Sequence, residues 1–132
     1  MAKPIIFNAQ ECPESRVEKA WGHEIIFENN EKYCGKLLVF KKGAKFSMHY
    51  HMIKDETWYV QKGEFIYRWI NTEEATIQSR KLSVGDAVRI PPGHPHQLEA
   101  ITSAIMFEVS TQHFDEDSYR VWKGDSQDES MD

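Results

Sequence analysis

Two histidines separated by a single residue, with a glutamate shortly after them, constrain the fold of this 132-residue chain more than any other feature. His49 and His51 end the run Lys45–His51, and Glu56 follows. Alternate side chains of a strand point to the same face, so a strand here would present both imidazoles to one side. A helix would place them roughly 200° apart, too far to bind one ion. The spacing therefore predicts a strand.

A second block of the chain brings a third histidine toward this pair. Asp86–Ile90 reads as a strand, and the turn Pro91-Pro92-Gly93 after it would direct His96 back at the first two histidines. Three imidazoles and one carboxylate suit Zn, Mn, Fe, Ni or Co. Four protein ligands leave coordination positions open, as in catalytic metal sites. We predict one divalent metal ion per chain, held by His49, His51, Glu56 and His96.

The other three histidines belong to no such pattern. We interpret His23 and His113 as structural. His94 lies in the turn before His96 and is expected near the site without binding the metal.

Short apolar and aromatic segments separated by turn signals predict an all-β domain, a sandwich or a barrel. The expected strands are Trp21–Glu28, Tyr33–Lys41, Lys45–His51, Thr57–Gln61, Glu64–Ile70, Ala75–Leu82, Asp86–Ile90, Gln97–Ile101 and Ala104–Ser110. The length allows one domain with a proper core. We expect an N-terminal arm over residues 1–20 with a possible edge strand at Ile5–Phe7, a barrel over 21–114, and an acidic segment over 115–132.

The acidic segment carries the charge of the chain. Residues 115–132 hold seven acidic and two basic side chains, which accounts for the whole net charge of −5. Its end lacks a hydrophobic period and is expected to be disordered, whereas Ser118–Lys123 is expected to form a short helix or strand on the barrel.

Composition also excludes several classes of partner. The body has no basic stripe of the kind that nucleic acid requires, and no apolar stretch approaches a membrane helix. Its two cysteines, Cys12 and Cys34, lack metal-site or redox spacing, which favours a reducing cytoplasm.

The two blocks together resemble the signature motifs of the cupin superfamily. They read Gly43-x5-His49-x-His51-x4-Glu56-x6-Gly63 and Gly85-x5-Pro91-x-Gly93-x2-His96. One position departs, because Ala100 stands where an asparagine often ends the second motif. The resemblance covers roughly residues 21–109. It implies a small double-stranded β-helix, the cupin jelly-roll barrel, with the metal inside.

Several shorter stretches are similar to the cupin (C-terminal) domain of bifunctional mannose-6-phosphate isomerase/mannose-1-phosphate guanylyltransferases. They are Lys19-Ala20-Trp21-Gly22, Phe46–His51, Glu56-Thr57-Trp58, Ile90–Glu99 and Phe107–Gln112. Two positions depart from that family's pattern. His49 replaces a glutamine, and Gln97 replaces a common arginine, which weakens the case for a phosphorylated substrate if that arginine holds a phosphate.

This closer resemblance implies a metal-dependent aldose–ketose isomerase acting on a sugar or sugar phosphate. The metal would polarise the substrate oxygens while a base moves a proton through an enediol. The sequence offers Lys45 and Glu108 as catalytic candidates, and Tyr59, Tyr67 and Arg89 as substrate contacts. Two alternatives stay open: a non-catalytic cupin that binds a sugar or stabilises a partner, and an Fe or Mn dioxygenase or decarboxylase. We expect a homodimer.

Overall fold

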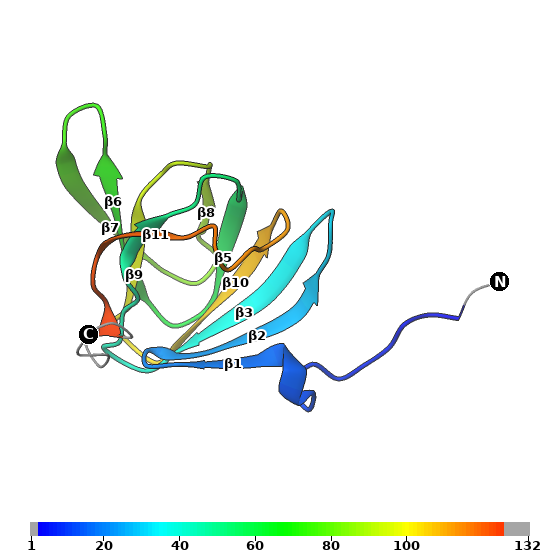
Figure 1. Cartoon of the computed structure of the whole chain (residues 1–132). Coiled ribbons are helices and arrows are strands. Elements are labelled where there is room, and N and C mark those ends of the chain that lie inside the picture. The colour runs from blue at the N-terminus through cyan, green and yellow to red at the C-terminus, as the bar shows by residue number, and fades with distance from the viewer. Residues whose placement is uncertain (1–2, 126–132) are drawn as a thin grey trace.

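The computed structural model describes residues 3–125, and nearly all of its regular structure is β-strand (Figure 1). A short 3-10 helix, η1 (Pro13–Ser15), precedes the strands. The strands are β1 (Arg16–Lys19), β2 (Gly22–Asn29), β3 (Cys34–Phe40), β4 (Met48–Tyr50), β5 (Glu56–Lys62), β6 (Phe65–Asn71), β7 (Thr76–Leu82), β8 (Ala87–Ile90), β9 (His96–Ala100), β10 (Ala104–Ser110) and β11 (Tyr119–Trp122). Among the described residues, we find no helix long and apolar enough to cross a membrane.

The strands form two antiparallel sheets that face each other. One has the order β1-β2-β3-β10-β5-β8, and the other has the order β11-β4-β9-β6-β7. Strands far apart in sequence are therefore neighbours: β3 pairs with β10, and β4 with β9. This arrangement confirms the predicted jelly-roll barrel.

Alternating side chains of the strands build the core between the sheets. In β5, Glu56, Trp58 and Val60 point inward and are buried, whereas Thr57 and Tyr59 point outward. Full burial of a large apolar side chain contributes roughly 1.5–3 kcal/mol. The largest such side chains come from both sheets and include Trp58, Phe65, Leu98, Met106 and Ile90.

Glycines of the two motifs occupy turns that other residues enter at a cost. Gly63, between β5 and β6, has φ +78°, and a Cβ atom there would lie 2.5 Å from the carbonyl oxygen of Ser103. A larger residue would therefore be strained by its backbone conformation and would collide with the β9–β10 connection.

The two ends of the described chain differ from expectation in instructive ways. Ile5–Phe7 forms no strand, and Ile5 and Ile6 are 94% and 85% exposed. The edge strand of the arm is instead β1, four residues that pair with β2. Pro4 and Pro13 lie on either side of residues 5–12. Because proline lacks the N–H group that strand pairing needs, both prolines disfavour a strand in this part of the arm.

At the other end, the segment expected as a helix or strand is the strand β11. It pairs with β4, so the second sheet extends beyond residue 114. The predicted disorder of the tail lies outside the described residues.

Candidate metal centre and its cavity

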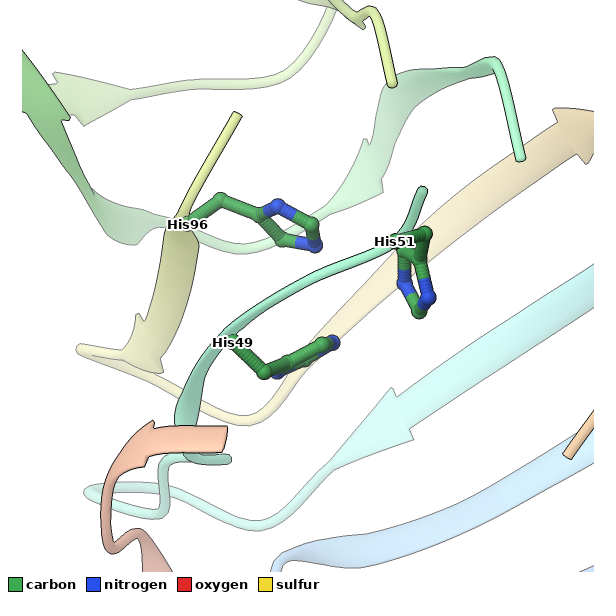
Figure 2. A group of neighbouring side chains, drawn as sticks. All are labelled: His49, His51 and His96. Atoms are coloured by element: carbon green, nitrogen blue, oxygen red, sulfur yellow. The ribbon is translucent and has the colours of Figure 1, made fainter. Parts of the chain in front are cut away.

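Pairing of β4 with β9 brings the three predicted histidine ligands together. His49 lies in β4, His51 follows the strand directly, and His96 begins β9 and is the register partner of His49. One ring nitrogen from each of the three lies within 4.8 Å of the others. Figure 2 shows the three rings turned toward a shared space. Three imidazoles in this arrangement can bind one divalent ion.

Backbone carbonyl groups fix the orientation of each imidazole. The Nδ1 atoms of His49, His51 and His96 lie 2.7, 2.5 and 2.8 Å from the carbonyl oxygens of Ser47, Asp117 and His94. Nδ1 must carry the hydrogen in these contacts, which leaves the lone pair on Nε2. Such hydrogen bonds are the usual outer support of metal-binding histidines.

Glu56 completes the predicted ligand set from the opposite sheet. Its Oε2 lies 3.4 Å from Nε2 of His51 and 3.9 Å from Nε2 of His96. Its Oε1 accepts a hydrogen bond of 2.7 Å from the indole of Trp58. Oε2 of Glu56 and Nε2 of His96 are buried and have no hydrogen-bond partner among the described residues. Buried polar atoms without partners are rare, and a cation between them would satisfy both. The three imidazoles thus form a cluster compatible with a divalent metal, and ligation by the adjacent Glu56 stays a prediction.

The protonation of the imidazoles suits metal binding, whereas the Glu56 carboxyl group must lose a proton to bind a metal. Burial lowers the pKa of His49 to about 3, aided by the adjacent His51. Burial lowers the pKa of His51 to about 4, aided by the Lys54 ammonium group. Burial and the nearby Glu108 raise the pKa of the Glu56 carboxyl group. The imidazoles are therefore neutral at pH 7, as metal ligands must be.

A buried network of charges lies beside the four ligands. Oε2 of Glu108 is 3.3 Å from Nζ of Lys54 and 3.8 Å from Nζ of Lys36, which itself lies 3.4 Å from Glu24. Oε1 of Glu108 accepts a hydrogen bond of 3.2 Å from Trp58. Burial opposes ionisation of Glu108, but the two ammonium groups outweigh it and hold the pKa of this carboxyl well below its usual range.

The ligands and the charge network line one cavity of about 680 Å³. Trp21, Phe46 and Trp58 supply aromatic wall, while Glu18, Lys19, His113 and Asp115 also contribute to the lining. The cavity therefore joins a candidate metal centre to a mixed polar and aromatic surface, as in many small-molecule sites.

The remaining predicted site residues divide between the cavity and other surfaces. Glu108 lines the cavity, whereas Lys45, Tyr59, Tyr67 and Arg89 are not among its lining residues. Tyr59 is 47% exposed on the outer face of the sheet. Arg89 forms an ion pair of 2.7 Å with Asp55 at the surface.

Tyr67 lies in β6 of the second sheet, and Lys45 forms an isolated β-bridge with Glu99 of β9. Tyr67 stacks on Trp69 and contacts the edge of Trp58. Strand alternation over Lys45–His51 would place Lys45 on the same face as the two histidines. Regular strand begins only at Met48, so this alternation does not reach Lys45.

Three side chains of the site carried no sequence signal that singled them out. Lys36 and Lys54 are 3% exposed and belong to no motif. Asp117 lies in the segment interpreted as an acidic tail, yet it is 4% exposed. Its carboxylate accepts hydrogen bonds from the backbone N–H groups of Met52, Ile53 and Lys54, and its carbonyl oxygen orients His51.

Comparison with known proteins identifies the family. Residues 36–111, more than half of the chain, match the family described as cupin domain. The chain belongs to the cupin family.

Solved structures share the fold at low sequence identity. CapF, a capsular polysaccharide assembling protein from Staphylococcus aureus, is 21% identical with a TM-score of 0.70, over 80% of this chain and 33% of its own. Oxalate decarboxylase from Bacillus subtilis is 16% identical with a TM-score of 0.73, over 87% and 31%.

KdgF from Halomonas sp. is 19% identical with a TM-score of 0.70, over 87% of this chain and 98% of its own. The chain thus spans about a third of the first two proteins and nearly all of the third. No curated protein sequence matches.

Proposed function

We propose that this cupin is a metal-dependent isomerase that interconverts the aldose and ketose forms of a small sugar. The observation that carries the proposal is the pair of buried atoms without partners, Glu56 Oε2 and His96 Nε2, in the wall of a cavity large enough for a sugar. The resemblance of several sequence stretches to mannose-6-phosphate isomerases supports the choice of reaction.

The four ligands and the charge network would divide the work. A divalent ion held by His49, His51, Glu56 and His96 would polarise the substrate carbonyl group and stabilise negative charge on its oxygen. Both oxygens of Glu108 already accept contacts from Trp58, Lys36 and Lys54. Glu108 would therefore hold these groups in place and balance their charge, and another group would transfer the proton.

Charges in the cavity favour an unphosphorylated sugar. Within residues 3–125, five lining carboxylates, from Glu18, Glu24, Glu56, Glu108 and Asp115, outnumber three lysines, and no arginine lines the cavity. Lys36 and Lys54 already face Glu108. Gln97, which stands where the isomerases commonly carry arginine, donates a buried hydrogen bond to the Phe46 carbonyl. Of the three lining lysines, Lys19 alone lies outside these ion pairs, so a dianionic phosphate would find few cationic partners, whereas sugar hydroxyl groups suit the carboxylates.

Metal analysis followed by anaerobic turnover in D2O tests the proposal. Free hexoses, free pentoses and hexose phosphates are incubated with metal-loaded protein and followed by NMR. We expect aldose–ketose interconversion of a free sugar with deuterium entering at C1 or C2, because the transferred proton exchanges with solvent. Chelation of the metal, or the change His49→Ala, should abolish turnover.

Other outcomes would favour the alternative functions. Turnover that requires oxygen, or release of CO2 from an added dicarboxylic acid, would replace the isomerase by an Fe or Mn dioxygenase or decarboxylase. Sugar binding without turnover in fully metal-loaded protein would indicate a non-catalytic binding cupin.

A further inference from the structure

His113 is a cavity residue that neither cupin motif includes. It lies in the connection between β10 and β11 and lines the same cavity as the candidate metal ligands. Asn29 of β2 fixes its main chain from both sides. The His113 N–H donates to Oδ1 of Asn29 at 2.9 Å, and Nδ2 of Asn29 donates to the His113 carbonyl at 3.1 Å. The ring is therefore held at a defined position in the wall.

The two ring nitrogens of His113 have different surroundings. Nε2 lies 2.9 Å from Oδ1 of Asp115, an acceptor, so Nε2 carries the hydrogen. Nδ1 is then the unprotonated nitrogen. It is buried and has no hydrogen-bond partner within residues 3–125. A buried acceptor without a donor is costly, and a hydroxyl group or an acidic C–H bond of a ligand would satisfy it once the ligand and the ring are in contact.

The charges that face His113 keep its ring neutral near pH 7. Burial lowers the pKa of His113, and the ammonium groups of Lys36 and Lys54 lower it further, while Asp115 acts in the opposite direction. A neutral imidazole that a carboxylate orients through its N–H is the usual form of a general base. Upon protonation, Asp115 would stabilise the imidazolium ion.

We propose that His113 is the proton-transfer residue of this cavity, with Nδ1 as the accepting atom and Asp115 as its positioning residue. The inference rests on the proposed function. The C2–H bond of an aldose breaks, its proton goes to Nδ1, and its electron pair forms the C1=C2 bond of an enediol. The hydroxyl proton passes from O2 to O1. Nδ1 then returns its proton to C1, which forms the C1–H bond and leaves the ketone at C2.

The variant His113→Asn tests this role, because its amide occupies the place of Nδ1 and cannot take up a proton. His23→Asn is the matched control, since His23 lies in β2 and does not line the cavity. General acid–base groups contribute typically 10²–10⁴-fold to rate. We expect kcat of His113→Asn to fall at least about a hundredfold with metal content unchanged, and deuterium exchange at C2 to fall in parallel.

A second measurement tests directly whether a sugar in the cavity contacts His113. Imidazole 15N NMR of zinc-loaded protein is recorded with and without D-fructose, and the Trp58 indole signal reports whether the sugar enters the cavity. A moving Trp58 signal with a moving His113 Nδ1 signal supports the inference. A moving Trp58 signal with an unchanged His113 signal overturns it.

The activity results separate the two proposals. If the wild type turns over and His113→Asn stays within threefold of it, the inference fails and the proposed isomerase stands. If the wild type turns over no sugar, the proposed function fails. Proton transfer by His113 then fails with it, even if the NMR experiment shows sugar contact.

Discussion

Asp117 offers the sharpest test of how the C-terminal segment supports the candidate metal centre. Its carboxylate binds the N–H groups of Met52, Ile53 and Lys54 at 2.8–3.2 Å, and its carbonyl oxygen lies 2.5 Å from Nδ1 of His51. These contacts hold the connection between His51, which directly follows β4, and Glu56, which begins β5. Removing the carboxylate should therefore weaken both folding and metal binding.

The expected magnitude follows from the burial of the three amides. Met52 and Ile53 are 57% and 62% exposed, so water can replace the lost acceptor at their N–H groups. Lys54 is 3% exposed, so its backbone N–H group would be left buried without an acceptor. A hydrogen bond to a charged group contributes about 1.5–3 kcal/mol, and an unsatisfied buried donor costs a similar amount. We expect Asp117→Ala to lower the free energy of unfolding of the metal-free protein by about 3 kcal/mol.

Metal affinity should fall as well, because the carbonyl group that orients His51 loses its anchored side chain. Changes to groups that support metal ligands typically cost 10–100-fold in affinity. Denaturant unfolding measures the first effect, and competition with a chromophoric zinc chelator measures the second. Asp117→Asn retains one acceptor oxygen, so its stability and zinc affinity should lie between those of the wild type and those of Asp117→Ala.

Glu116→Ala is the control, because this exposed neighbour should change stability by less than about 0.5 kcal/mol. Wild-type stability and zinc affinity in Asp117→Ala would refute the reasoning.

Three further predictions concern the whole molecule. Metal-free protein should lose stability from pH 7 to pH 5, because His49 and His51, with folded pKa values of about 3 and about 4, stay neutral while unfolded imidazoles take up protons below about 6.5. Together, His49 and His51 should lower the free energy of unfolding by roughly 4 kcal/mol at pH 5. The raised pKa of Glu56 acts in the opposite direction. Urea titrations that show no net loss of stability between pH 7 and pH 5 would contradict the prediction. Lys36→Met should cost about 3–5 kcal/mol in the same assay by leaving Glu108 short of a buried partner, and a loss below about 1 kcal/mol would show that water reaches that carboxylate. The homodimer stays a prediction, and light scattering that gives a monomer mass at micromolar concentration would contradict it.

Local patterns in the sequence predicted most of the strands. Ala104–Ser110 was placed correctly, and the other central strands differ by a few residues at their ends. The clearest error is at Lys45–His51, where only Met48–Tyr50 is strand. Strand alternation is a property of consecutive residues, and it could equally have shown that Tyr59 faces away from Glu56. The spacing of the two motifs also identified the three histidines that the structure brings together.

Tertiary structure decided everything that depends on which strands are neighbours. Lys36, Lys54 and Glu108 come from β3, the β4–β5 connection and β10, and only the pairing within the barrel makes them a network. The same holds for His113 beside the cavity, which sequence interpretation had left as a structural residue.

Asp117 shows the limit most plainly. By composition, it belongs to an acidic tail, but β11 returns to β4 and carries the residues before it into the barrel. Side-chain periodicity is encoded locally and can be read from the sequence. Contacts between distant segments are fixed only when burial and hydrogen bonding select one strand order. Local sequence patterns therefore determined the barrel and the three clustered histidines, and the tertiary fold determined what surrounds them.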